Sequence, residues 1–345
     1  MAKVGIRDVA RAAGVSITTV SHALSVDHRE RVNADTRRRI EEVAARLGYL
    51  PNRIASTLRN RRSYVLGLVS DHIASSPFAG DLVLGAQDAA YERGWLVTLV
   101  DSGGDTALET RQIATLVQHQ VDGILYARMY HQKVTVPESV RGVPHVVVNA
   151  EDKDKNCSAV APNEAAAART AVRELIDAGH RRIGFLNNRQ NVLASADRLD
   201  GYRAALAEAG IRYRPEFVTH ETPDVSGGRE GALRLLGLAD PPTGLFCFRD
   251  PQALGTYEAA WSLGLTIPED LSVTSIDDFE LISAGIRPTL STVALPHYRM
   301  GQWGARRLLD EIETPDAPHV PELLLAECPL VRRGSVAPPR ITRRR

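Results

Sequence analysis

The sequence has few cysteines and no long apolar run. Its 345 residues include only three cysteines, which lie far apart at Cys157, Cys247 and Cys328. An odd number at this spacing fits neither a disulfide framework nor a zinc site, so we expect reduced, buried structural cysteines. No apolar run approaches the roughly 18–20 residues that a membrane span requires. Because residues 1–8 also lack the apolar region of a signal peptide, we expect a cytoplasmic protein without membrane contact.

The short motifs of common enzyme classes are missing as well. No predicted strand is followed by the G-x-G-x-x-G turn of dinucleotide-binding enzymes, and Gly103-Gly104 is a poor substitute for it. There is no P-loop, no G-x-S-x-G nucleophile turn and no helix with metal-binding His and Glu. We therefore predict no catalytic residue, no metal and no cofactor. A binding protein is favoured, and a dehydrogenase-like enzyme with the same strand pattern is the alternative.

The net charge of the chain is zero, but the charges are distributed unevenly along it. Residues 1–62 carry 13 Lys/Arg against 6 Asp/Glu, and the remainder carries 29 against 36. A basic segment joined to a larger acidic one indicates that only the first part meets a polyanion. The length of the chain fits about two or three domains.

Two short helices joined by a tight turn are predicted near the start of the chain. Residues 6–13 carry apolar side chains at the spacing of one helix face. Gly14 follows, where a helix ends in a left-handed residue, and Ser16 can cap a second helix over residues 17–24. This arrangement is the helix-turn-helix unit. A third helix is predicted over residues 34–47.

The outward side of the second helix carries the residues that we expect to contact DNA. Its short side chains can reach base edges or phosphates in a major groove: Ser16, Ile17, Thr18, Thr19, Ser21 and His22. Arg31 in the following loop is a further candidate, and Arg37, Arg38 and Arg39 can face the DNA backbone. A three-helix module that binds protein is the alternative. The turn, the cap, the polar set and the charge together favour double-stranded DNA.

Residues 50–62 are predicted to form a hinge and linker. Asn52 can cap a helix of about two turns, with Ile54, Ala55 and Leu58 on one side. A helix this short is marginal alone in water because nucleation is costly, so we expect it to form when paired with a copy of itself on DNA. Leu58 would then wedge into a minor-groove step, and Asn52, Ala55 and Leu58 are all candidate DNA-binding residues. A plain basic linker is the alternative.

These motifs together resemble the head of the lac repressor/purine repressor (LacI-type) family. The resemblance implies a DNA-binding transcriptional regulator that acts as a repressor, and a hinge helix whose leucine, Leu58, opens a central base step. Gly5 departs from the family pattern, since a Thr cap is usual there, and the loop over residues 25–31 is about two residues longer than common. The matching segments occur in the family's order and spacing: Asp8-Val9-Ala10, Ala13-Gly14-Val15-Ser16, Thr19-Val20-Ser21, Thr36-Arg37, Leu47-Gly48-Tyr49 and Pro51-Asn52.

From residue 63 onward, short aliphatic runs alternate with amphipathic segments. Nine such runs, from 65–70 to 291–295, are separated by predicted helices such as 79–93 and 164–178. Near-continuous Val/Ile/Leu strands that alternate with helices indicate parallel sheets covered on both faces. Nine strands fit two doubly wound lobes better than one closed barrel. The predicted fold class is therefore α + α/β, with a helical head and a two-lobed core.

The residues that follow these strands form the predicted ligand site, because such sheets bind ligands beyond their strand ends. Phe78, Tyr126 and Asn149 come from the first lobe. Arg249 and Asp277 come from the second lobe, and Arg198, at the start of a predicted helix, can turn into the same cleft. Two arginines in one cleft would suit a carboxylate or phosphate, so an acidic metabolite is favoured as the effector, and a sugar is the alternative.

The core also resembles the periplasmic-binding-protein-like domain of the same family. The segments that match include Gly179-His180-Arg181-Arg182 and Arg198-Leu199-Asp200-Gly201-Tyr202. The resemblance implies that Arg198 and Asp277 hold polar groups of a small-molecule effector. An ion pair of Arg198 with a neighbouring aspartate and a strand-end cap by Asp277 are the alternatives. Val192, Ala194 and Arg249 depart from the pattern, which makes an unmodified standard sugar less certain.

The expected organisation is a head at 1–49, a hinge and linker at 50–62, a core at 63–334 and a basic tail at 335–345. Within the core, the first lobe is expected at about 63–160 plus 292–322, and the second at about 161–291 plus 323–334. The tail has no leucine heptads of the kind that pair dimers into tetramers, so we predict a homodimer that binds a pseudo-palindromic operator. Effector-driven closure of the lobes is expected to decide whether the two hinges meet.

Overall fold

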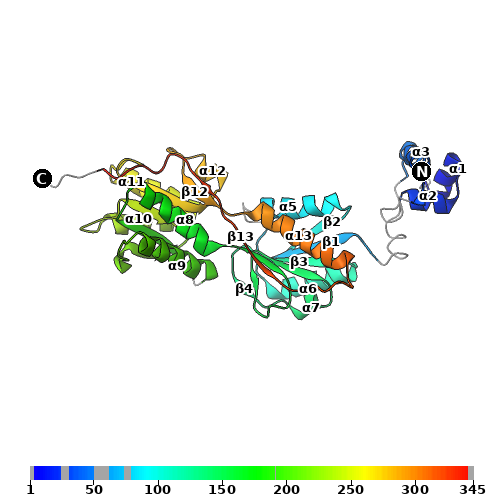
Figure 1. The fold of residues 1–345 in the computed structure, drawn as a ribbon, viewed down its shortest axis with the longest axis horizontal. Helices are drawn as coiled ribbons and strands as arrows, with labels where there is room; N and C mark the ends of the chain where they lie inside the picture. The colour runs from blue at the N-terminus through cyan, green and yellow to red at the C-terminus, as the bar shows by residue number, and fades with distance from the viewer. Residues whose placement is uncertain (1–3, 25–30, 50–61, 74–78, 191, 341–345) are drawn as a thin grey trace.

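The computed structural model describes residues 4–24, 31–49, 62–73, 79–190 and 192–340 (Figure 1). The expected hinge helix with Asn52, Ala55 and Leu58 lies outside the described residues, and so does Phe78. Within the described ranges, no helix is both long enough and apolar enough to cross a membrane.

The head contains three helices at the predicted places. Helix α1 spans Ile6–Ala13, α2 spans Ile17–Ala23 and α3 spans Ala34–Leu47. Gly14 ends α1 in the left-handed region with φ 65°, which costs glycine no steric strain. Ser16 caps α2, since its Oγ accepts the N–H of Thr19 at 3.0 Å. The helix-turn-helix predicted from the sequence is confirmed.

The three helices of the head share one small apolar core. Asn33 caps α3 by accepting the N–H of Thr36 at 2.8 Å. At the start of α1, where Gly5 has no side chain, the Asp8 carboxylate accepts the N–H of Gly5 at 3.0 Å. This contact is the half of a capping box that the third helical residue supplies, and Gly5 cannot supply the other half because it has no side chain. The buried apolar residues are Val9, Ala10, Ala13, Val20, Ala23, Val32, Ile40, Val43 and Ala44.

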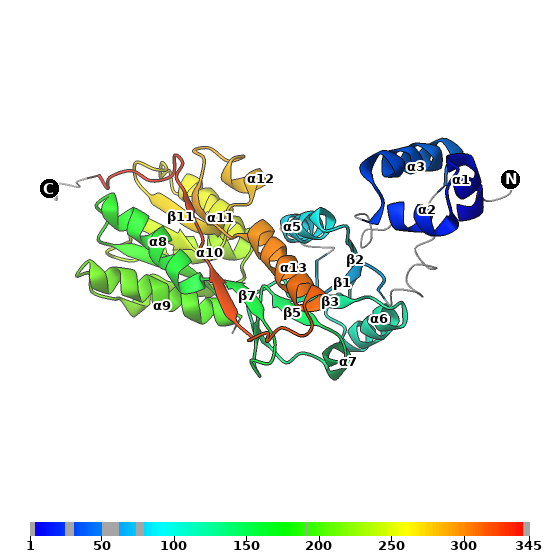
Figure 2. The same cartoon turned by 45° about the vertical axis from the view of Figure 1, so that its right-hand side comes forward.

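The first lobe of the core is a parallel sheet with helices on both faces. Its strand order is β13-β7-β5-β3-β1-β2. Helices α5 (Ala79–Glu92) and α13 (His297–Glu313) lie side by side on one face, while α6 (Thr106–Gln118) and α7 (Glu138–Arg141) pack on the other (Figure 2). The strands are β1 (Val65–Ser70), β2 (Leu96–Asp101), β3 (Gly123–Ala127), β5 (His145–Val148), β7 (Ala159–Pro162) and β13 (Leu323–Ala326). Strands β4 (Lys133–Val134) and β6 (Glu151–Asp152) form a separate short pair.

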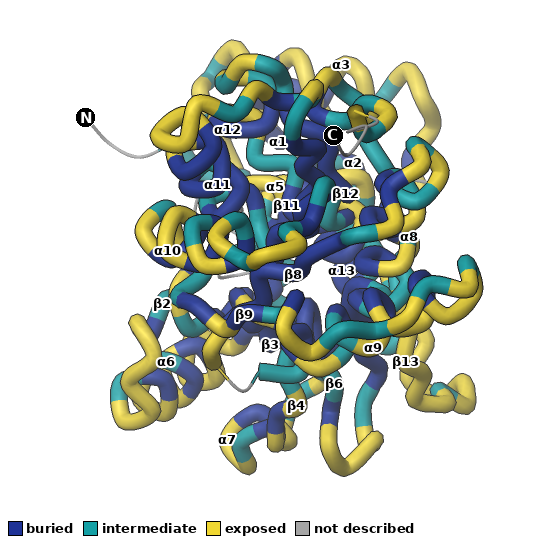
Figure 3. Tube along the Cα trace, turned by 90° about the vertical axis from the view of Figure 1, so that its left-hand side faces the viewer, coloured by how far each residue is buried: buried dark blue, intermediate teal, exposed yellow. Residues whose placement is uncertain are grey.

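The second lobe repeats this architecture with the strand order β14-β12-β11-β10-β8-β9. Helices α8 (Glu164–Asp177) and α9 (Leu193–Glu208) cover one face, and α10 (Val225–Leu236) and α11 (Asp250–Ser262) cover the other. The inner strands of both sheets are buried between their helices, as the dark strands of Figure 3 show, whereas the edge strands β2 and β13 of the first lobe are largely exposed. The strands are β8 (Ile183–Asn188), β9 (Val218–Glu221), β10 (Gly244–Cys247), β11 (Ser272–Asp277), β12 (Ser291–Ala294) and the antiparallel β14 (Leu330–Val331), with a 3-10 turn at Pro215–Phe217 and α12 at Glu280–Ser283.

The chain crosses between the lobes at places that differ from the expected boundaries. Strand β12 (Ser291–Ala294) pairs with β11 and so belongs to the second lobe, although residues 292–294 were expected in the first. Strand β13 (Leu323–Ala326) pairs with β7 and so belongs to the first lobe, although it was expected in the second. Each strand is assigned by its hydrogen-bonded neighbour, and local sequence does not specify that neighbour.

The expected tail also begins too early. Ser335 is completely buried, and its Oγ donates to the Val273 carbonyl at 2.6 Å and accepts the N–H of Ser291 at 2.8 Å. Ala337 exchanges two further hydrogen bonds with the Ser272 hydroxyl. Residues 335–337 are therefore part of the second lobe. Residues 341–345 lie outside the described ranges.

Helices α10 and α11 approach each other closely because glycine stands at their crossing. A Cβ on Gly255 would lie 1.9 Å from the Val225 carbonyl oxygen, and one on Gly228 would lie 2.1 Å from the Gln252 carbonyl oxygen. We expect Gly255→Ala to lower the free energy of unfolding by about 1–3 kcal/mol, because the backbones must separate. Urea unfolding would measure this loss. Gly80→Ala is the matched control, since that helical glycine faces open space, and an equal loss in both variants would contradict the explanation.

Candidate functional site

The first candidate surface is the exposed side of α2. Ser16, Ile17 and Thr18 are exposed at the start of this helix, and Ile17 is 45% exposed despite its apolar side chain. The other predicted contacts on α2, which are Thr19, Ser21 and His22, are half-buried. Arg31, just before α3, is exposed. Six of the seven residues thus lie on α2 or at its cap, with the apolar core of the head behind the helix, and Arg31 lies shortly before α3.

This surface has the chemistry of a nucleic-acid interface. Hydroxyl groups can donate and accept hydrogen bonds at base edges, and the apolar Ile17 can contact a thymine methyl group. The Ser16 and Thr19 hydroxyls lie 2.8 Å apart, so each holds the other in place at the beginning of the helix. Arg38 pairs with Asp35 at 2.9 Å on the exposed first turn of α3, and Arg39 is exposed beside it. Such arginines can contact phosphates.

The second candidate site is a cavity of ≈ 380 Å³ between the two lobes. Its size lies within the usual range for small-molecule sites. Four of the six predicted effector residues line it: Asn149, Arg198, Arg249 and Asp277. The remaining lining residues are His72, Met129, Tyr130, His131, Glu164, Ala194, Phe248, Leu295 and His297.

One wall of the cavity is built around Arg198 on α9. The guanidinium Nε lies 2.7 Å from Glu164 Oε2, and both side chains are almost completely buried. The guanidinium also lies over the Phe248 ring, 4.1 Å from its centroid, and donates to the Phe248 carbonyl oxygen. The pair is therefore with Glu164 on α8, and not with either of the aspartates that flank Arg198 in the sequence. This arrangement fixes the guanidinium plane at the cavity surface.

A second arginine–carboxylate pair lies on the same wall. Arg249 Nε is 3.0 Å from Asp277 Oδ2, and Arg249 also bonds the Tyr130 side chain of the first lobe. Asp277 ends β11 with φ 131°, and the next residue, Asp278, has φ 59°. Positive φ at residues other than glycine costs conformational energy, and such strain is common at functional sites.

Buried hydrogen bonds of Asp250 stabilise the turn at Asp277 and Asp278. The Asp250 Oδ2 accepts the N–H of Phe279 at 2.7 Å, and its Oδ1 accepts from the hydroxyls of Ser275 and Thr292. Burial raises the pKa of Asp250 to about 7, with a further contribution from Asp277. The carboxyl group thus ties the start of α11 to β11 and β12, on which Asp277 is carried.

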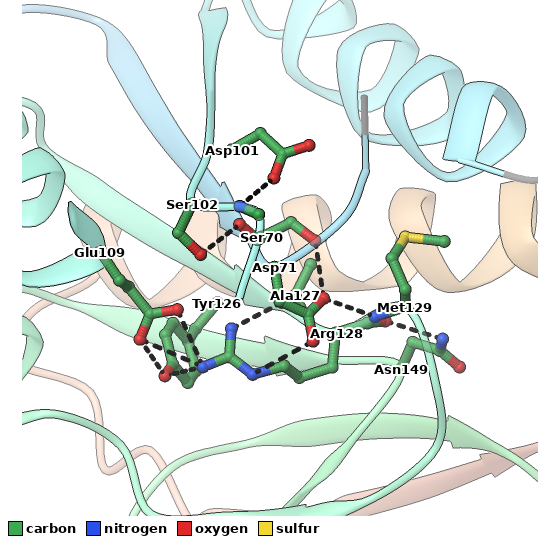
Figure 4. Close-up of polar contacts among 11 residues, drawn as sticks. Ser70, Asp71, Asp101, Ser102, Glu109, Tyr126, Ala127, Arg128, Met129 and Asn149 are labelled. Carbon is green, nitrogen blue, oxygen red and sulfur yellow. Dashed lines mark hydrogen bonds and ion pairs between the residues drawn. The ribbon is translucent and has the colours of Figure 1, made fainter. Parts of the chain in front are cut away.

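The opposite wall rests on a buried ionic network in the first lobe (Figure 4). Arg128 Nη2 lies 3.1 Å from Glu109 Oε2, and the Arg128 Nε lies 4.0 Å from Asp71 Oδ2. Asp71 Oδ1 accepts the N–H of Met129 at 3.0 Å, and the Arg128 carbonyl accepts from Asn149 Nδ2 at 2.8 Å. The network therefore positions Asn149 and Met129 at the cavity.

Tyr126, which was expected in the site, belongs to this network and does not line the cavity. It is 2% exposed, and its hydroxyl donates to Glu109 Oε1 at 2.8 Å. Tyr126 is still inside β3 and faces the α6 side of the sheet. The residues that reach the cavity, Met129 to His131, come after the strand end. The same strand-end rule identifies Phe248 after β10 and Leu295 after β12, which we did not select.

Cys157, Cys247 and Cys328, which were expected to be buried, are free cysteines in the structure. Cys247 and Cys328 are buried, whereas Cys157 is only half-buried. Burial is the main cause that raises the pKa of each thiol to about 12. None of them is a reactive thiolate at neutral pH. Within the described ranges, no group of His, Cys, Asp and Glu could hold a metal ion.

Comparisons with known proteins agree for both parts of the chain. Residues 5–52 match the family model "Bacterial regulatory proteins, lacI family", and residues 172–336 match "Periplasmic binding protein-like domain". The chain is 31% identical to the ribose operon repressor of Haemophilus influenzae, covering 90% of this chain and 92% of that protein. It is 32% identical to the HTH-type transcriptional repressor CytR of Escherichia coli K12, with 96% and 95% covered. The solved complex of the transcriptional regulator CelR with cellobiose is 27% identical and covers 96% of this chain and 100% of that one, with a TM-score of 0.67.

Proposed function

The chain belongs to the LacI family of bacterial regulatory proteins. From this premise we propose that a sugar bound between its lobes controls its affinity for operator DNA. It is a DNA-binding transcriptional regulator and not an enzyme. The observation that carries the proposal is the inter-lobe cavity with two buried arginine–carboxylate pairs, Arg198–Glu164 and Arg249–Asp277. Such pairs offer fixed donors and acceptors side by side, which suits adjacent hydroxyl groups.

Charge balance favours a neutral sugar over an acid. The four charged side chains that line the cavity are two arginines and two carboxylates, so each arginine already faces an anion. A ligand carboxylate or phosphate would have to displace Glu164 or Asp277, which would leave a buried carboxylate without its cation. One relative is a repressor of a ribose operon, and the solved regulator CelR is a complex with cellobiose. We therefore propose a neutral saccharide and set the acidic effector aside.

Calorimetric titration tests this assignment. Ribose, other neutral pentoses and hexoses, and cellobiose would be compared with gluconate and sugar phosphates, with and without operator DNA. We expect a neutral sugar to bind, and operator DNA to change its affinity about 5–150-fold, because coupling between two sites is reciprocal. Binding of acids alone would overturn the effector class, and an affinity independent of DNA would overturn the regulatory coupling.

The DNA side of the proposal joins the head to the hinge. We propose that a homodimer places two copies of α2 in successive major grooves of a pseudo-palindromic operator. Asn52, Ala55 and Leu58 would pair between copies, with Leu58 in the minor groove. Closure of the lobes would set the distance between the two hinges and so favour or prevent their pairing. Because the target is chromosomal DNA, we propose that the protein acts in the bacterial cytoplasm, on the nucleoid.

Thr18→Ala tests the contact surface of α2. Thr18 is exposed, and its truncation removes a hydroxyl and a methyl group without disturbing the core of the head. We expect operator affinity to fall by about 1–3 kcal/mol, the usual value of one specific base contact. Fluorescence anisotropy with labelled operator would measure the change. Thr110→Ala, an exposed threonine on α6, is the control, and unchanged affinity in Thr18→Ala would remove this residue from the interface.

A further inference from the structure

A histidine beside the cavity lies between carboxylates of both lobes. His131 follows β3 in the first lobe, and its Nε2 is 3.1 Å from Glu151 Oε1 on β6. Its Nδ1 is 4.0 Å from Asp197 Oδ2 on α9 of the second lobe. The imidazole is almost completely buried, and Nδ1 has no hydrogen-bond partner among the described residues. His131 therefore faces one carboxylate that it already contacts and another that it does not yet reach.

The protonation state of the imidazole decides whether both contacts can form. A neutral imidazole has one donor and one acceptor, whereas an ionised carboxylate only accepts. A neutral His131 can thus bond one of Glu151 and Asp197 and must present a lone pair to the other. An imidazolium donates from both nitrogens and satisfies both carboxylates. Burial raises the pKa of Asp197, and His131 opposes that rise.

The segment Met129–His131 of the first lobe lines the cavity and contacts the second lobe. Its residue Tyr130 bonds Arg249 of the second lobe. The segment is anchored from below, since Asp71 holds the Met129 N–H. Movement of one lobe against the other therefore changes the distance between His131 and Asp197 directly. A shortening of the 4.0 Å separation by about 1 Å brings Nδ1 and Asp197 to hydrogen-bond distance.

We propose that Glu151, His131 and Asp197 form a latch between the lobes, which closes when the effector binds and takes up a proton at His131. This rests on the proposed function, because the effector supplies the closing force. The proton comes from solvent and ends on the imidazole, and no bond between heavy atoms is made or broken. Among the described residues, other charged or titratable groups also surround the latch. They are Lys133, 3.8 Å from Glu151 Oε2, Glu164 and Asp200 near Asp197, and the cavity residues His72, Tyr130, Arg198, Arg249, Asp277 and His297.

A titration without any ligand tests the pairing. The imidazole signals of His131 would be followed by NMR against pH in the full chain and assigned by their loss in His131→Gln. We expect the titration midpoint to move to lower pH in Asp197→Asn and in Glu151→Gln, because each change removes an anion that favours the imidazolium. Asp200→Asn, on the same helix but exposed, should leave the midpoint in place. An unchanged midpoint in Asp197→Asn would refute the latch.

Ribose binding measured by calorimetry in two buffers of different ionisation heat tests the coupling to closure. We expect uptake of up to about one proton per site, and an affinity that rises by at most about tenfold for each pH unit lowered. Both effects should vanish in His131→Gln and Asp197→Asn. Sugar binding with undiminished proton uptake in these variants would refute the latch and leave the effector site standing. If no sugar binds, the proposed effector class fails, while the ligand-free titration still decides the latch.

Discussion

Arg198→Met should abolish effector binding and lower the free energy of unfolding by about 3–5 kcal/mol. The Glu164 carboxylate is almost completely buried, and Arg198 Nε, 2.7 Å away, is the cation that pairs with it. Methionine would fill part of the space but leave the carboxylate without its cation in a site of low polarity. The stack on Phe248, at 4.1 Å, and the donor that faces the cavity would be lost as well. Urea unfolding and ribose calorimetry would measure the two losses.

A second substitution separates stability from recognition in this pair. In the double variant Arg198→Met with Glu164→Gln, neither of these two positions carries a buried charge. We therefore expect most of the stability to return while sugar binding stays absent. Arg203→Met is the matched control on α9, because that arginine is partly exposed and its pairing with Asp200 at 3.5 Å is worth little. Sugar binding retained in Arg198→Met would show that Arg198 has only a structural role.

Asp250→Ala should cost about 3 kcal/mol of unfolding free energy and weaken effector binding. The carboxyl group accepts from the Phe279 N–H and from the hydroxyls of Ser275 and Thr292, and each buried donor left without an acceptor costs about 1–3 kcal/mol. Asp277 would lose the support of its turn. Asp250→Asn is the matched variant, since its amide can donate to both hydroxyls while its oxygen accepts from Phe279. Equal losses in the alanine and asparagine variants would contradict this assignment.

The same residue predicts a pH dependence of stability. Burial raises the pKa of Asp250 from its ordinary value to about 7, so the folded chain keeps a proton that the unfolded chain releases above about pH 4. The contribution of Asp250 to stability therefore falls as pH rises through this window, by at most about 1.4 kcal/mol per pH unit, and levels off above it. Urea unfolding of the natural chain and of Asp250→Asn at pH 5, 6, 7 and 8 measures this contribution as the difference between them. A difference independent of pH would contradict it.

Local patterns were sufficient to predict the head and the class of the core. The apolar spacing in residues 6–13, the left-handed Gly14 and the cap at Ser16 all act within a few residues. Each of these features can therefore be recognised from a few neighbouring residues. Alternation of aliphatic runs with amphipathic segments likewise predicted parallel sheets with helices on both faces. Asn149, Arg249 and Asp277, which line the cavity, were predicted from the rule that ligands bind beyond strand ends. Arg198, which also lines it, lies on α9 and was predicted mainly from the family resemblance.

The rule does not apply to Tyr126, because this residue lies inside the predicted strand 123–127, which β3 matches. Its side chain packs on the α6 side of the sheet and belongs to the buried Glu109–Arg128 network. Glu164 carries no signal of its own, because it opens an ordinary helix and becomes important only beside Arg198, 34 residues later. The contacts of His131 with Glu151 and Asp197 likewise join residues that are distant in the chain.

The sequence by itself determined the helix-turn-helix head, the two-lobed class of the core and the residue types gathered near the cleft. These features depend on helix caps, period and strand-end position, which are properties of neighbouring residues. The tertiary structure alone decided to which lobe β12 and β13 belong and which carboxylate pairs with each arginine. It alone also showed that His131 lies between carboxylates of both lobes. Those outcomes depend on strand pairing and on burial between distant segments. The charge balance of the cavity, and with it the choice of a neutral effector, follows from such long-range contacts.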